Sequence, residues 1–99
     1  MTIATSHQSA DLSRRLDIIN KKGLHARASA KFVKIAESYD ADVLVTKNGA
    51  SVCGTSIMGL MMLAASDGCC IDVSASGNDA KQVLDALQAL VKNRFNEEC

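Results

Sequence analysis

Asp42-Val-Leu-Val-Thr-Lys-Asn-Gly-Ala-Ser-Val-Cys53 is the stretch of sequence that decides the fold. Residues 42–47 have the pattern of a strand. Asn48-Gly49 is a pair that two-residue type I′ turns prefer, because both central residues of such a turn have positive φ angles. The turn leads into a second strand over residues 50–53. The stretch therefore predicts a β-hairpin, and with it an antiparallel sheet.

Two more strands are predicted on either side of this hairpin. Residues 15–20 alternate well enough to form a strand, and Lys21-Lys22-Gly23 breaks it. Residues 70–76 form the other strand and follow an Asp67-Gly68 turn. The sheet is therefore expected to have four strands.

Three helices are predicted between and after the strands. Over residues 26–39 apolar side chains recur every three or four positions, which is typical of an amphipathic helix. Ser56 is a good N-cap for a short helix over residues 57–65. Gly77-Asn78-Asp79 is expected to cap the last helix. The apolar stripe of that helix consists of Val83, Leu84, Leu87, Leu90 and Val91.

The predicted element order is β-α-β-β-α-β-α. An antiparallel sheet with its helices on one face forms an α+β domain of two layers. Residues 1–13 are polar and show no periodicity, so we expect a flexible N-terminal arm followed by one domain over residues 14–99. A chain of 99 residues without proline or an internal repeat favours a single core.

Composition argues against several classes of function. The chain has 11 basic and 11 acidic residues, whereas a general nucleic-acid binder is usually basic. Its longest apolar run, residues 57–65, is too short to span a membrane, and we find no secretory signal. The four cysteines form no CxxC motif. We expect small buried thiols in a reducing, cytoplasmic compartment, and no metal site.

The segment Asn20-Lys-Lys-Gly-Leu-His-Ala-Arg-Ala-Ser29 carries the candidate chemistry. Gly23 allows a sharp turn, so we expect His25 at the cap of a helix and Arg27 in its first turn. The positive end of the helix disfavours a protonated imidazole, which leaves a ring nitrogen able to attack phosphorus. Free helix N–H groups and Arg27 can then hold the new dianion. Phosphoryl transfer asks mainly for such positioning and charge stabilisation.

Residue types alone also allow a simpler interpretation of this segment. His25 would then be an exposed histidine beside a helix cap and Arg27 a surface arginine, since short motifs have false positives. His7 lies in the expected arm and is interpreted as uninvolved. The sequence contains no carboxylate pair, glycine-rich phosphate loop or Ser-His-Asp arrangement. A complete hydrolase or kinase site is therefore not expected.

Two segments resemble one known family. Gly23-Leu-His-Ala-Arg27, followed by Ala30-Lys-Phe-Val33, is similar to the active-site segment of HPr, the histidine-containing phosphocarrier of the phosphoenolpyruvate phosphotransferase system. Ser56-Ile-Met-Gly-Leu-Met-Met-Leu63 resembles the second signature of that family. The resemblance covers about residues 15–95, with both motifs at the family's spacing.

The resemblance implies an open-faced β-sandwich, in which four antiparallel strands have three helices on one side. It implies a carrier and not an enzyme, with no cofactor. Enzyme I would phosphorylate His25 on Nδ1, Arg27 would hold the phosphate, and the carrier, expected to be a monomer, would pass the group to an IIA domain. Ala28 stands where many members have proline, which should cost little because alanine is an excellent helix former.

The second signature carries two further expectations. Ser56 by itself is a helix cap, while the resemblance implies a regulatory serine that HPr kinase/phosphorylase modifies in many bacteria. Leu60 and Leu63 are expected to point inward. The positions that match the family's partner-docking patch are Ile57, Met58 and Met61.

Two alternatives stay open on the sequence. The element order also allows a small ligand- or RNA-binding regulatory domain of ferredoxin-like topology. Against it stand neutral charge, only one tyrosine and two phenylalanines, and no aromatic stretch on a central strand. Within the phosphocarrier hypothesis, the sequence does not separate the sugar branch of the phosphotransferase system from its nitrogen-related branch.

Overall fold

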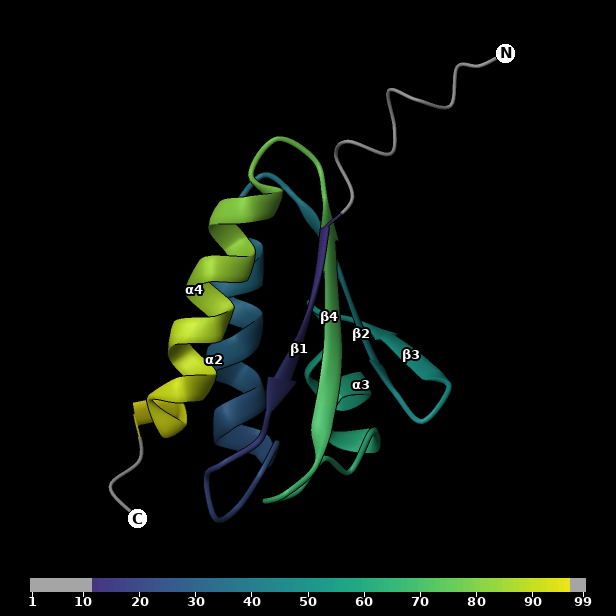
Figure 1. Ribbon diagram of the computed structural model, residues 1–99, viewed down its shortest axis with the longest axis vertical. Coiled ribbons are helices and arrows are strands. Elements are labelled where there is room, and N and C mark those ends of the chain that lie inside the picture. Colours follow the sequence, from purple (N-terminus) through teal and green to yellow (C-terminus); the bar gives the residue numbers. More distant parts are fainter. Residues whose placement is uncertain (1–11, 97–99) are drawn as a thin grey trace.

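The computed structural model describes residues 12–96. One antiparallel sheet has the strand order β1-β4-β2-β3. Its strands are β1 (Leu12–Asp17), β2 (Asp42–Lys47), β3 (Ala50–Cys53) and β4 (Cys70–Ser76). Helices α2 (Ala26–Glu37) and α4 (Ala80–Lys92) lie side by side over one face, and the short α3 (Ile57–Met62) packs against α2 and β3 (Figure 1). The predicted element order and the α+β class are confirmed.

Side chains of the sheet alternate between a buried face and an open face. Val45 of β2 pairs with Val73 of β4, and both are fully buried under the helices. The predicted stripe of α4, Val83 to Val91, is buried against the same core. The opposite face of the sheet carries small and polar side chains with one larger apolar residue, Leu44, which is 43% exposed. The helices thus cover one side and leave the other open.

The hairpin forms as predicted. Its strands pair from Leu44 with Cys53 to Lys47 with Ala50. Asn48 and Gly49 have φ angles of 51° and 85°, the two positive values of a type I′ turn. The Asn-Gly pair therefore fixes the register of β2 and β3.

The first strand begins and ends earlier than the sequence predicted. It starts at Leu12, which pairs with Ala75, and ends at Asp17, which pairs with Cys70. Its limits follow those of β4, because an edge strand has only one neighbour to pair with. Leu12 and Ser13, assigned to the flexible arm, therefore belong to the sheet. The rest of that arm, residues 1–11, lies outside the described residues.

Two helices end before the predicted residue. α2 stops at Glu37 because Ser38 turns back on Ile35, whose carbonyl accepts bonds from the backbone N–H (3.0 Å) and the hydroxyl of Ser38 (2.7 Å). α3 stops at Met62 because Ala64 takes a left-handed conformation with φ of 54°. This early turn lets the chain bury Leu63 and Ala65.

One local expectation is confirmed in position only, and another is wrong. Asp79 occupies the N-cap of α4, but its carboxylate accepts a bond from the backbone N–H of Asp40 (2.8 Å) and makes none to its own helix. The cysteines were expected to be buried, but Cys53 and Cys70 are exposed and Cys69 is half-buried. Cys53 and Cys70 are exposed because they lie on the open face of the sheet. All three are free thiols. Cys99 lies outside the described residues.

Neither a membrane span nor a metal-binding cluster is found in residues 12–96. None of the helices there is long and apolar enough to cross a bilayer. No group of three or more His, Cys, Asp or Glu side chains in that part of the chain could hold a metal ion.

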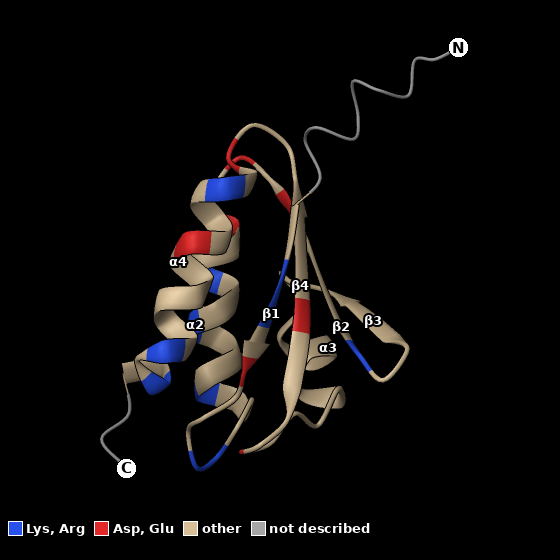
Figure 2. Ribbon diagram, in the orientation of Figure 1, with Lys and Arg blue, Asp and Glu red and all other residues tan. Residues whose placement is uncertain are grey.

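One ion-pair cluster ties α4 to the edge of the sheet. The carboxylate of Asp85 accepts a hydrogen bond from Lys81 (3.0 Å) and lies 2.6 Å from the guanidinium of Arg14 on β1. Figure 2 shows that α4 and β1 both carry basic and acidic segments. The Lys81 hydrogen bond first, and the Arg14 bond second, lower the pKa of Asp85 below its usual value.

This lowered pKa predicts an acid-sensitive contribution to stability. A carboxyl group whose folded pKa is lowered stabilises the fold above its unfolded pKa of about 3.9, and the effect is lost as pH falls through the folded value. We expect Asp85→Asn to lower the free energy of unfolding slightly at about pH 7 and to leave it nearly unchanged at about pH 2. Urea unfolding at both pH values checks this, and an equal loss at both would contradict it.

Candidate functional site

His25 occupies the N-cap of α2, as predicted. Its backbone is extended (φ −79°, ψ −177°), and its carbonyl accepts the first helical hydrogen bond, from the N–H of Ser29 (2.8 Å). Its side chain is half-buried. Arg27 lies in the first turn of the helix and is exposed. His25 therefore caps the positive end of a helix whose first N–H groups have no partner within the helix itself.

A sharp turn at Gly23 delivers the chain to this cap. Gly23 has a φ of +62°, a left-handed conformation that glycine adopts without strain. A Cβ at this position would lie 2.2 Å from the carbonyl oxygen of Ala65. The next residue, Leu24, donates its N–H to that same oxygen (2.9 Å). The His25 segment is thus packed backbone to backbone against the chain that leaves α3.

Two buried polar residues beside His25 were not predicted from the sequence. Asn20 donates its side-chain amide to the carbonyl of Gly23 (3.0 Å), and the hydroxyl of Ser29 donates to the carbonyl of Leu24 (3.2 Å). Signals for both were present. Ser29 falls on the buried face of α2, one position after Ala28 and three before Phe32. Asn20 precedes a turn, where asparagine side chains often bond to nearby backbone.

Helix α3 presents an apolar surface, which we call the α3 patch. It consists of Ile57 (39% exposed), Met58 (73%), Met61 (43%) and Met62 (79%). Leu60 and Leu63 are buried, as predicted. The exposure of Met62 was not predicted, because the predicted helix continued beyond this residue, whereas α3 ends there. α3 packs beside α2, and Ala65, in the segment that follows α3, accepts a hydrogen bond from the N–H of Leu24. The patch and His25 therefore belong to one region of the molecule (Figure 1).

Ser56 is the N-cap of α3. Its hydroxyl oxygen accepts a hydrogen bond from the N–H of Gly59 (3.0 Å), and its side chain is half-buried. Gly59 is close-packed, since a Cβ there would lie 3.0 Å from the Ser56 hydroxyl. The capping role expected from the sequence is therefore present, directly before the α3 patch.

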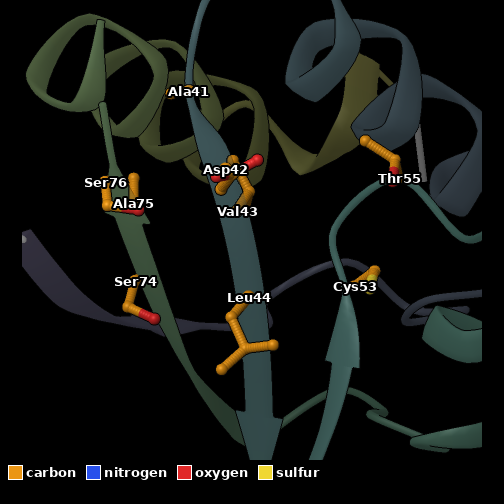
Figure 3. Close-up of a pocket in the computed structure, with 9 residues that line it drawn as sticks. All are labelled: Ala41, Asp42, Val43, Leu44, Cys53, Thr55, Ser74, Ala75 and Ser76. Carbon is orange, nitrogen blue, oxygen red and sulfur yellow. The ribbon is translucent and has the colours of Figure 1, made fainter. Parts of the chain in front are cut away.

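A shallow hollow of about 510 Å³ lies elsewhere, on the open face of the sheet. Figure 3 shows Leu44 of β2 between Ser74 of β4 and Cys53 of β3. The lining residues include neither His25 nor Ser56. His25 and Ser56 therefore lie outside this hollow.

Comparisons with known proteins agree with this geometry. A family model described as the PTS HPr component phosphorylation site matches residues 12–93. The phosphocarrier protein HPr of Cupriavidus necator is 48% identical over 86 residues, which are 87% of this chain and 97% of that protein. The phosphocarrier protein NPr of Shewanella violacea is 38% identical, over 87% of this chain and 94% of that protein.

Solved structures agree as well. The crystal structure of HPr-C-His from Thermoanaerobacter tengcongensis has a TM-score of 0.85 at 38% identity and covers 89% of this chain and 99% of that one. An HPr from Bacillus anthracis has a TM-score of 0.79 at 40% identity and covers 83% and 98% of the two chains. This chain is thus similar both to proteins named HPr and to a protein named NPr.

Proposed function

Because the chain belongs to the HPr family of phosphotransferase-system phosphocarriers, we propose that His25 is the residue on which it carries the phosphoryl group. By its family the protein is a carrier and not an enzyme. The observation that best supports His25 is its position at the N-cap of α2, within the segment that the family's phosphorylation-site model covers.

The transfer step follows from this position. A ring nitrogen of His25, which we assign as Nδ1, attacks the phosphorus of a phosphorylated donor. The new nitrogen–phosphorus bond forms as the donor's bond to phosphorus breaks, and the donor keeps that electron pair. The first N–H groups of α2 and the guanidinium of Arg27 stabilise the charge on the phosphoryl oxygens. Onward transfer repeats the same exchange, with the acceptor as nucleophile.

The partners in this proposal are enzyme I as donor and an IIA domain as acceptor. Both would dock on the α3 patch, where Ile57, Met58 and Met61 lie next to the His25 region. Flexible methionine side chains suit a surface that must fit several partners in turn. We place the carrier in the cytoplasm, since the exposed free thiols of Cys53 and Cys70 fit a reducing compartment. We propose that it acts as a monomer, because it must dock with several partners in turn.

Phosphorylation by enzyme I tests the proposal directly. The full chain is incubated with its cognate enzyme I and phosphoenolpyruvate, and intact-mass spectrometry counts the phosphoryl groups gained. We expect one group per chain that is lost again in acid, as phosphohistidine is. An unchanged mass with an active enzyme I would contradict the proposal.

We propose Ser56 as a regulatory position within the same function. A phosphate there would add a charge of about −1.5 to −2 beside the α3 patch. The beginning of α3 tolerates negative charge, so the fold should persist. Apolar docking next to Ile57 and Met58 would become unfavourable, because the partner would have to desolvate the charge. An HPr kinase/phosphorylase is the expected modifying enzyme.

Two substitutions at Ser56 separate its two roles. Ser56→Ala removes the bond to Gly59 and should lower the free energy of unfolding by about 1 kcal/mol, with phosphoryl acceptance retained. Ser56→Asp keeps a capping oxygen and should leave stability nearly unchanged, but the added charge should raise the KM for enzyme I. Denaturant unfolding and transfer kinetics measure both effects. Equal kinetics in the two variants would contradict a regulatory role.

A further inference from the structure

The backbone that leads into His25 is held at every residue from 23 to 25. Three successive carbonyls accept hydrogen bonds: that of Gly23 from the Asn20 amide (3.0 Å), that of Leu24 from the Ser29 hydroxyl (3.2 Å), and that of His25 from the Ser29 N–H (2.8 Å). Two N–H groups are also held. Gly23 donates to the carbonyl of Asn20 (3.2 Å), and Leu24 donates to that of Ala65 (2.9 Å).

Two buried polar side chains make this arrangement possible. Asn20 is 1% exposed and Ser29 is 0% exposed, and they are the buried polar residues of the described chain, residues 12–96. Burying an amide or a hydroxyl is unfavourable unless it forms hydrogen bonds. They lie on opposite sides of the same loop, Asn20 before Gly23 and Ser29 in the first turns of α2. Their placement therefore indicates that they stabilise the loop and not the core as a whole.

We propose that Asn20 and Ser29 are positioning residues for phosphoryl transfer, an inference that rests on His25 being the carrier residue. Carbonyl oxygens carry partial negative charge and would repel the oxygens of an incoming phosphoryl group. With the carbonyls of residues 23–25 tied to buried donors, the loop is fixed in the one conformation that leads His25 to the positive end of α2. The imidazole is then held ready for attack before a partner docks.

A purely structural role makes a different prediction from a positioning role. If the two side chains only stabilise the fold, removing either would lower the free energy of unfolding and leave transfer in the folded protein unchanged. If they position His25, the folded variant transfers more slowly. Docking depends on the α3 patch, which neither side chain belongs to, so the KM for the donor should not move.

Ser29→Ala is the decisive variant, with Ser38→Ala as its control. Both changes remove a serine hydroxyl that donates a hydrogen bond to a backbone carbonyl a few residues earlier in the chain. Ser38, however, lies at the far end of α2 and bonds to Ile35. Transfer from phosphorylated enzyme I is measured on the full chain at a temperature where unfolding data show each variant folded. We expect kcat to fall about tenfold for Ser29→Ala, with KM unchanged, and both constants to stay at the wild-type values for Ser38→Ala.

Asn20→Ala provides a second test from the other side of the loop. It removes the donor to Gly23, and we expect a similar loss in kcat. Wild-type kcat in a folded Ser29→Ala variant would overturn the proposal, as would a change in KM alone or an equal loss in Ser38→Ala. These outcomes differ from failure of the proposed function, in which the wild-type chain itself would accept no phosphoryl group from enzyme I.

Discussion

Replacing His25 with alanine is expected to abolish phosphoryl acceptance while the fold stays intact. The substitution removes the only nucleophile that the proposal assigns to the site, so transfer should fall by at least about a thousandfold, or about 4 kcal/mol in the barrier. The side chain is only half-buried, and surface substitutions of this kind usually change stability by about 0.5 kcal/mol or less. Intact-mass spectrometry after incubation with enzyme I and phosphoenolpyruvate measures acceptance, and circular dichroism measures the fold.

The chain offers a matched control in its second histidine. His7→Ala makes the same change outside the candidate site, and we expect it to accept one phosphoryl group at the wild-type rate. If phosphoryl acceptance persisted in His25→Ala and disappeared in His7→Ala, His7 and not His25 would be the carrier residue. Acceptance in both variants would show that neither is the carrier.

Gly23→Ala should produce the largest loss of stability among the changes considered. A left-handed residue with a Cβ costs about 1–2 kcal/mol by itself. Here the Cβ would also lie 2.2 Å from the carbonyl oxygen of Ala65 and 2.7 Å from the Cα of Ser66, both of which are backbone atoms that cannot rotate away. We expect the free energy of unfolding to fall by about 3 kcal/mol or more. That is a large part of the total of about 5–15 kcal/mol for a small domain. Urea unfolding measures it.

Gly68→Ala separates the close contact from the backbone strain. Gly68 also has a positive φ, of +93°, but no atom lies within 4 Å of a Cβ added there. Its replacement should therefore cost only the strain, about 1–2 kcal/mol. Equal losses for Gly23→Ala and Gly68→Ala would show that the packing of the His25 loop against Ala65 contributes little.

Features with a local cause could be predicted from the sequence. The Asn48-Gly49 turn depends on two residues that accept positive φ, and the apolar stripe of α4 depends on spacing along one helix. The N-cap position of His25 also follows locally, from the turn at Gly23 and the apolar period that begins soon after it. These features needed no knowledge of distant contacts.

Features set by distant contacts could not be predicted. The limits of β1 depend on β4, far along the chain, and α3 ends where Leu63 and Ala65 turn into the core. The exposure of Cys53 and Cys70 depends on which face of the sheet the helices cover. Leu24 of the His25 loop donates its N–H to the carbonyl of Ala65, which lies outside the motif, and no local pattern indicates this bond.

The measurement that tests the account most directly is an NMR spectrum of the phosphorylated chain with ¹⁵N-labelled imidazoles. The protein is phosphorylated by enzyme I and phosphoenolpyruvate, and phosphorus–nitrogen coupling identifies the modified atom. We predict one phosphorylated nitrogen, Nδ1 of His25. A phosphoryl group on any other residue, or no phosphohistidine after reaction with an active cognate enzyme I, would contradict it.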